Sequence, residues 1–125
     1  MIEQIKGMPA GTLGFRAIGK VTADDYESVL VPDVEAVFAL NDKLRMLYQL
    51  GPEFEGFDLG AMWDDAKLGL RHVNGWDRVA VVTDVPWVRS MVETTGLLTQ
   101  AHGKLFGNDE FDEAMAWIDE GKDTA

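Results

Sequence analysis

The stretch that decides the fold is Trp76-Asp-Arg-Val-Ala-Val-Val-Thr-Asp-Val-Pro-Trp87. Its centre, Val79–Val82, is a run of apolar residues without polar alternation, which is typical of a strand that is covered on both faces. Thr83 or Asp84 can then cap a helix, and Pro86 falls in the first helical turn, where its missing N–H costs nothing. A buried strand that leads straight into a helix predicts a parallel sheet of the α/β class.

Four other segments along the chain are predicted strands. Ile2–Lys6 and Thr12–Val21 form a hairpin, because apolar residues in the second segment alternate with a period of two. Lys43–Leu50 alternates in the same way and is expected to end at Gly51-Pro52, whereas Lys104–Phe106 is short. The sequence therefore predicts an N-terminal hairpin followed by strands that are separated by longer, helical segments.

Helices are predicted after all strands except the first. The first helix is capped by Thr22, and we expect a break or kink near Val31, because Pro32 interrupts its apolar stripe. The last two helices start at Pro86 and at the cap Asn108. The resulting order, β-β-α-β-α-β-α-β-α, predicts one α/β domain over residues 1–125, with a mostly parallel sheet and helices packed on it.

The strongest helical signal spans Asp58–Val73, with Asp58 as its N-cap. Leu68 is an apolar residue on the otherwise polar face of this helix, which makes it a candidate interface contact. The opposite face is predicted to be buried, and its apolar residues are Leu59, Met62, Trp63, Ala66, Leu70 and Val73.

Composition excludes several classes of function. The chain has 125 residues and a formal net charge of −11, from 22 acids and 11 bases, which argues against nucleic acid and anionic lipid surfaces as partners. Residues 108–125 alone carry seven acids and one base. The absence of cysteine excludes disulfides, thiolate catalysis and Cys-ligated metals. The sequence predicts neither a signal peptide nor a transmembrane segment, so we expect a cytoplasmic protein.

No set of residues in the sequence predicts a catalytic, metal or cofactor site. Gly14–Lys20 has the G-x-x-x-x-G-K spacing of a phosphate-binding loop, but Val21 stands where Ser or Thr is needed, and the segment alternates as a strand. Serine hydrolase chemistry lacks its G-x-S-x-G motif. His102 falls in a Gly-containing loop, where it could act as a general base, but no nucleophile motif accompanies it. An enzyme would have to pair His102 with Asp84.

Aromatic residues gather near the predicted carboxyl ends of two strands, where open α/β sheets build ligand sites. Phe54 and Phe57 lie in the loop predicted after the third strand, and Trp63 and Trp87 start the two following helices. Together with Asp84 they are the candidate residues of an apolar ligand pocket. Core packing of the aromatic residues and helix capping by Asp84 are the alternatives.

Three segments together resemble a known family: Phe54-Glu-Gly-Phe-Asp-Leu-Gly-Ala-Met-Trp-Asp-Asp-Ala-Lys-Leu-Gly-Leu-Arg-His72, then Trp76–Asp84, and Phe111-Asp-Glu-Ala-Met-Ala-Trp-Ile118. They resemble the SpoIIAA-like family, also described as STAS/SEC14 domain-containing proteins. The resemblance implies a small α/β domain similar to anti-sigma factor antagonists and to the lipid-binding CRAL-TRIO fold. In such antagonists, phosphorylation of a Ser or Thr at the start of the helix after the third strand acts as a switch. Between Gln49 and Trp63 this chain has neither residue, so the resemblance does not extend to that switch.

These observations lead to three hypotheses of function. The first is a noncatalytic cytosolic STAS-like module that binds a protein partner or itself and needs no cofactor. The second is a carrier or sensor of a small hydrophobic or lipid-like ligand, bound at the aromatic residues. The third is an enzyme that uses Asp84 and His102.

Overall fold

The computed structural model describes residues 1–9, 11–63, 67, 75–94 and 103–120. Their strands are β1 (Ile2–Gln4), β2 (Thr12–Val21), β3 (Leu44–Phe57), β4 (Trp76–Thr83) and β5 (Gly103–Phe106). The strands form one sheet in the order β1-β2-β3-β4-β5, where β1 is antiparallel to β2 and all other neighbours are parallel. The predicted α/β class, with its hairpin and mostly parallel sheet, is confirmed.

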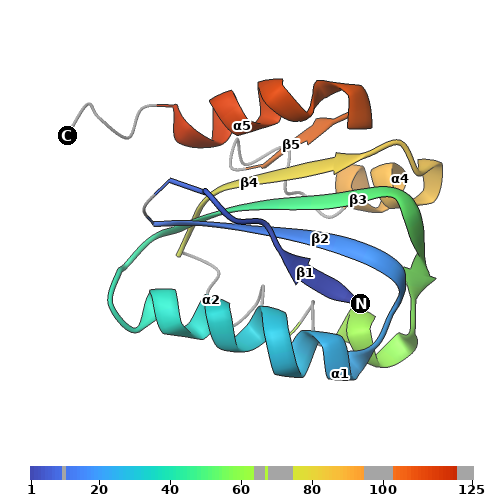
Figure 1. Ribbon diagram of the computed structural model, residues 1–125, viewed down its shortest axis with the longest axis horizontal. Coiled ribbons are helices and arrows are strands. Elements are labelled where there is room, and N and C mark those ends of the chain that lie inside the picture. Colours follow the sequence, from blue (N-terminus) through green and yellow to red (C-terminus); the bar gives the residue numbers. More distant parts are fainter. Residues whose placement is uncertain (10, 64–66, 68–74, 95–102, 121–125) are drawn as a thin grey trace.

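Helices cover both faces of this sheet (Figure 1). On one face lie α1 (Ala23–Asp25), the π-helical η1 (Tyr26–Leu30) and α2 (Val31–Phe38), which follow one another as a single rod. The helical residues 59–63, here called the helix at 59–63, and α4 (Pro86–Thr94) add Ala61 and Val88 to the core on this face. The 3-10 segment η2 (Asn108–Glu110) and α5 (Phe111–Asp119) lie on the opposite face, where Ala114 and Ile118 pack on Leu47 and Val82 of the sheet.

The rod after β2 stays helical through Pro32, so the predicted break near Val31 does not occur, but the helix changes there from the π-helical η1 to α2. The chain stays helical and passes through the π-helical turn η1, in which the Val31 N–H donates to the Tyr26 carbonyl. Pro32 cannot donate a backbone hydrogen bond, and its ring would clash with the preceding turn of a regular α-helix. The π turn changes the hydrogen-bonding pattern just before Pro32. Tyr26 and Leu30 remain buried throughout this turn.

β3 runs past Gly51-Pro52, where it was predicted to end, and continues to Phe57. Its pairing with β2 is irregular at this point, because Ala17 lies opposite Leu50 while Gly19 lies opposite Phe54. β3 thus carries extra residues in a bulge, a place where a sheet tolerates proline. The extension puts Phe54 and Phe57 on a strand rather than in the predicted loop.

The Gly14–Lys20 segment is part of β2, as its alternation predicted, and does not form a phosphate-binding loop. Gly14 allows close packing, because a Cβ there would lie 2.9 Å from the Met8 Sδ. Gly19 has a φ of +64°, a backbone conformation that residues with side chains rarely adopt. Both glycines are therefore explained by the geometry of the strand.

The start of α5 differs from its prediction. Asn108 does not act as the cap; the Gly107 N–H instead donates to Glu110 Oε1 at 2.7 Å, and η2 precedes the regular helix. In a capping box, the Glu at the third helical position accepts a hydrogen bond from the backbone N–H of the residue that precedes the helix, and Glu110 makes this contact with Gly107.

Two arginines from the sheet hold the carboxyl end of α5. Arg45 Nη1 donates to the carbonyls of Ile118 at 2.8 Å and Glu120 at 2.6 Å, and its Nε donates to Asp77 Oδ2 at 2.7 Å. Arg78 Nη1 donates to the Trp117 carbonyl at 2.7 Å. Cations at this end bind carbonyls of the last turn, of which that of Trp117 also accepts from the Glu120 N–H at 3.2 Å, and they complement the helix dipole.

Candidate functional site

Three of the predicted aromatic site residues meet at the carboxyl end of the sheet. The ring centroids of Phe54 and Phe57 lie 4.9 Å apart, and Trp87 lies 6.0 Å from Phe54 and 6.1 Å from Phe57. Tyr26 of η1 adds an edge contact to Phe57 at 6.4 Å. These tilted and edge-on contacts are favourable aromatic geometries. The rings of Phe54, Phe57 and Trp87, here called the aromatic cluster, join the extension of β3 to the start of α4.

The fourth aromatic residue, Trp63, lies on the exposed face of the helix at 59–63. Asp58 caps this helix as predicted, because the Ala61 N–H donates to Asp58 Oδ1 at 2.7 Å. The prediction of its buried face was wrong for Leu59, Met62 and Trp63, whose exposed fractions are 85%, 40% and 65%. The other residues of that predicted face, Ala66, Leu70 and Val73, lie outside the described residues.

The inward side of this helix is formed by small residues. Ala61 is fully buried, and a Cβ at Gly60 would lie only 2.7 Å from the Cβ of Ala23 in α1. Such close packing leaves no room for a large side chain, so Leu59, Met62 and Trp63, at positions i, i+3 and i+4, share the outer face. The Gly60-Ala61 pair is the sequence signal that could have identified this orientation.

Trp87 adds an apolar side chain near the start of α4. It is 47% exposed, and its ring contacts Phe57, which precedes Leu59 by two residues along the chain. We call Leu59, Met62, Trp63 and Trp87 the exposed apolar patch. Among the described residues, the other large hydrophobic side chains with comparable exposure, Met1 and Leu40, lie outside these two helices.

Asp84 connects two structural elements. Its Oδ1 accepts a hydrogen bond from the Asn108 N–H at 3.1 Å, which ties the end of β4 to the start of η2. Thr83, rather than Asp84, provides the local turn contact, because its hydroxyl accepts from the Val85 N–H at 3.1 Å. Asp84 therefore has a structural contact that accounts for its position, separate from the aromatic cluster.

Two of the candidate site residues lie outside the described residues. These are His102, the proposed partner of Asp84 in an enzyme, and Leu68, the candidate interface contact. Both assignments stay predictions.

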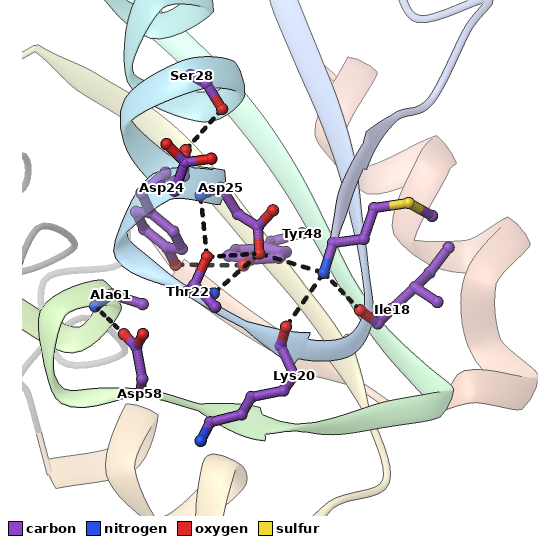
Figure 2. Close-up of polar contacts among 11 residues, drawn as sticks. Ile18, Lys20, Thr22, Asp24, Asp25, Ser28, Tyr48, Asp58 and Ala61 are labelled. Carbon is purple, nitrogen blue, oxygen red and sulfur yellow. Dashed lines mark hydrogen bonds and ion pairs between the residues drawn. The ribbon is translucent and has the colours of Figure 1, made fainter.

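A polar network lies beside the patch, where β2 ends and α1 begins (Figure 2). The Asp25 carboxylate accepts from the Thr22 N–H at 2.9 Å and lies 3.2 Å from the α-ammonium group of Met1. That ammonium group also donates to the Ile18 carbonyl at 2.7 Å. Close by, the buried hydroxyl of Tyr26 donates to that of Tyr48 at 3.2 Å. The network fixes α1, against which the helix at 59–63 packs.

These contacts also change the acidity of Asp25. Burial alone would raise the pKa of this carboxyl group, but the hydrogen bonds from Thr22 and the ammonium group of Met1 outweigh burial. The pKa is therefore lowered below its ordinary value, because the partners of Asp25 favour its charged form. Asp25 is held as a carboxylate at neutral pH and serves to cap the rod.

The described part of the chain shows neither a group of metal ligands nor a membrane-spanning helix. Among these residues, no three His, Asp or Glu side chains are grouped so that they could hold a metal ion. None of the helices formed by these residues combines the length and the apolar character needed to cross a bilayer.

The parallel sheet with its N-terminal hairpin, and the aromatic edge beside a capped helix, define a small α/β domain of the STAS type. The sequence matches the SpoIIAA-like family over residues 12–119, and the chain belongs to that family. No curated protein matches the sequence.

Solved structures similar to this chain include the following two. One is an uncharacterised protein with a SpoIIAA-like fold from Shewanella loihica PV-4, with a TM-score of 0.71 and 28% sequence identity over 94% of this chain and 92% of that one. The other is the anti-sigma factor antagonist SpoIIAA in its unphosphorylated form, with a TM-score of 0.64 and 13% identity over 96% of this chain and 99% of that one. At 13% identity, the second likeness shows the fold alone.

Proposed function

We propose that this chain is a noncatalytic cytosolic interaction module, which binds a protein partner or a second copy of itself through the exposed apolar patch. The observation that carries the proposal is the orientation of the helix at 59–63, whose large apolar side chains face outward while its small ones face the core. An ordinary surface helix has the opposite arrangement. Folding does not explain the exposed side chains, whereas burial against a partner does.

The composition of the patch suits this role. Tryptophan is enriched among the residues that dominate binding energy at protein interfaces, and the patch contains Trp63 and Trp87. Moving a large apolar side chain from water into an interface contributes roughly 1.5–3 kcal/mol. Several such side chains would provide the apolar centre of an interface, and Leu68 remains a further candidate contact.

The geometry supports the other two hypotheses less well. A hydrophobic carrier needs space between its aromatic residues, but the rings of the aromatic cluster contact one another. Native mass spectrometry of the purified protein tests for a retained apolar ligand. An enzyme based on Asp84 would have to use a carboxylate that already accepts a hydrogen bond from Asn108.

The proposal is tested by comparing two leucines of equal exposure, Leu59 in the patch and Leu40 after α2, at 85% and 87%. Tagged wild type, Leu59→Ser and Leu40→Ser are used to recover cross-linked partners from cells of the source organism. Light scattering of the purified proteins separates self-association from a different partner. We expect association with wild type and Leu40→Ser and its loss with Leu59→Ser. Equal recovery or equal self-association by all three would contradict the role of the patch.

A further inference from the structure

Acidic side chains lie beside the exposed apolar patch. Asp24 and Glu27 are exposed on the rod that packs against Gly60, and Asp24 directly follows Ala23, the residue in closest approach to that glycine. Glu53 and Glu55 are exposed on the extension of β3 that leads into the same helix. The exposed bases nearest to these segments along the described chain are Lys20, at the end of β2, and Lys67. Acids thus outnumber bases around the patch.

This charge distribution bears on what can dock there. In a twofold dimer formed through the patch, the same surface of both copies would meet, so two surroundings that each carry more acids than bases would face each other. Like charges that face each other across an interface oppose association, and the whole chain already carries a formal net charge of −11. A partner with lysine or arginine around an apolar surface would instead complement both the exposed apolar patch and the acids near it.

From this combination we infer that the occupant of the exposed apolar patch is a basic protein surface, apolar at its centre and cationic at its rim, rather than a second copy of this chain. The inference rests on the proposed function, since it names the class of partner for the same surface. The outward face of the helix at 59–63 presents side chains at i, i+3 and i+4, the spacing with which a helix enters an apolar groove. Cationic groups at the rim of that groove would lie opposite Asp24 and Glu27.

The charge preference can be measured with two helical peptides as probes. Each has one leucine face, and the opposite face is all lysine in one peptide and all glutamate in the other. The four tryptophans of the chain supply the readout, because Trp63 and Trp87 lie in the patch while Trp76 and Trp117 do not. We expect the lysine peptide to shift the indole N–H resonances of Trp63 and Trp87 alone. It should bind about tenfold more tightly than the glutamate peptide, a difference that several screened surface charge pairs can supply.

Two matched variants separate local charge from total charge. Asp24→Asn with Glu27→Gln neutralises acids beside the patch, and Asp112→Asn with Glu113→Gln neutralises two exposed acids in the first turn of α5, on the opposite face of the sheet. We expect the first pair to remove most of the preference for lysine and the second to keep it. Loss of the preference by both pairs to the same degree would overturn the inference, because it would reflect net charge alone.

The outcomes also separate the inference from the proposed function. If both peptides shift Trp63 and Trp87 with equal affinity, the surface is a docking site without charge selection, and the inference fails while the proposed function stands. Self-association through the patch, detected by light scattering and lost in Leu59→Ser, likewise overturns the basic partner alone. If Trp117 shifts in place of Trp63 and Trp87, the patch is not the docking site and both proposals fail.

Discussion

The helix at 59–63 and α5 have opposite arrangements of apolar residues. In α5 the buried residues are Ala114 and Ile118, and the acids Asp112 and Glu113 are exposed. In the helix at 59–63 the buried residue is Ala61, whereas Leu59 and its large neighbours are exposed. Apolar spacing is helical in both, so periodicity identifies a helix without showing which face it buries.

The difference follows from what each helix packs against. α5 lies on a broad sheet surface that accepts Ile118, and its carboxyl end is held by Arg45 and Arg78. The helix at 59–63 meets α1 at Gly60, at a distance that allows only small side chains. The apolar residues of α5 therefore contribute to folding, whereas those exposed in the helix at 59–63 are available for binding. Each of the following predictions could break or refine this comparison.

The largest effect is expected for Ile118→Ala in α5. Removing a fully buried isoleucine loses its transfer free energy and leaves a cavity, at a cost of about 2–5 kcal/mol in the free energy of unfolding. Urea denaturation monitored by circular dichroism measures it, with Leu40→Ala as the exposed control. A loss below about 1 kcal/mol, the range of ordinary substitutions, would mean that α5 does not depend on its apolar face.

Arg45→Met tests how α5 is held at its carboxyl end. The side chain of Arg45 is 10% exposed and loses contacts with one carboxylate and two carbonyls, so we expect a cost of about 2–3 kcal/mol. Arg16→Met is the matched control, because Arg16 is 38% exposed and contacts Gln49 and Glu3 near the surface. The same denaturation experiment should give less than about 1 kcal/mol for the control. If both variants lose the same free energy of unfolding, the buried Arg45 does not stabilise the fold more than the half-exposed Arg16.

The sequence predicted the sheet well, because its signals there are local. Val79–Val82 is uniformly apolar and forms the interior of β4, and the period of two in Thr12–Val21 corresponds to β2. The errors came from contacts between distant segments. Pairing with β2 past Leu50 carries β3 through Gly51-Pro52 to Phe57, and no local rule for strand ends includes such pairing.

The candidate site was predicted in composition but not in orientation. The sequence predicted Phe54, Phe57 and Trp87 at one edge of the sheet, because parallel strands align their carboxyl ends. In the structure these rings are in contact. Trp63 was assigned to the core from its helical spacing. Its exposure depends on the approach of Ala23 to Gly60, a contact across 37 residues of chain that periodicity does not reveal.

A smaller effect is expected at Asp25, which fixes the rod beside the patch. Asp25→Ala removes a capping contact and should cost about 1 kcal/mol at pH 7. Because the folded-state pKa is lowered, wild type has this stabilisation above the unfolded-state pKa of about 3.9 and loses it as the pH falls through the folded-state pKa. The difference between wild type and Asp25→Ala in urea titrations should therefore shrink below about pH 4. Asp24→Ala, at an exposed neighbour, is the control, and a difference that persists unchanged to low pH would contradict the role of the carboxylate.

The smallest effect on stability, and the most direct test of the comparison, is expected for Leu59→Ala. Its side chain is already in water, so its removal should change the free energy of unfolding by no more than about 0.5 kcal/mol. Leu44→Ala is the matched control, because Leu44 is fully buried and the same truncation should cost about 2–5 kcal/mol. Both are measured in the same urea titration, together with the binding assays for the patch. A leucine that contributes nothing to folding but is needed for association is retained for its partner. If Leu59→Ala instead costs as much as Leu44→Ala, Leu59 belongs to the core in solution, and the helix at 59–63 then resembles α5 after all.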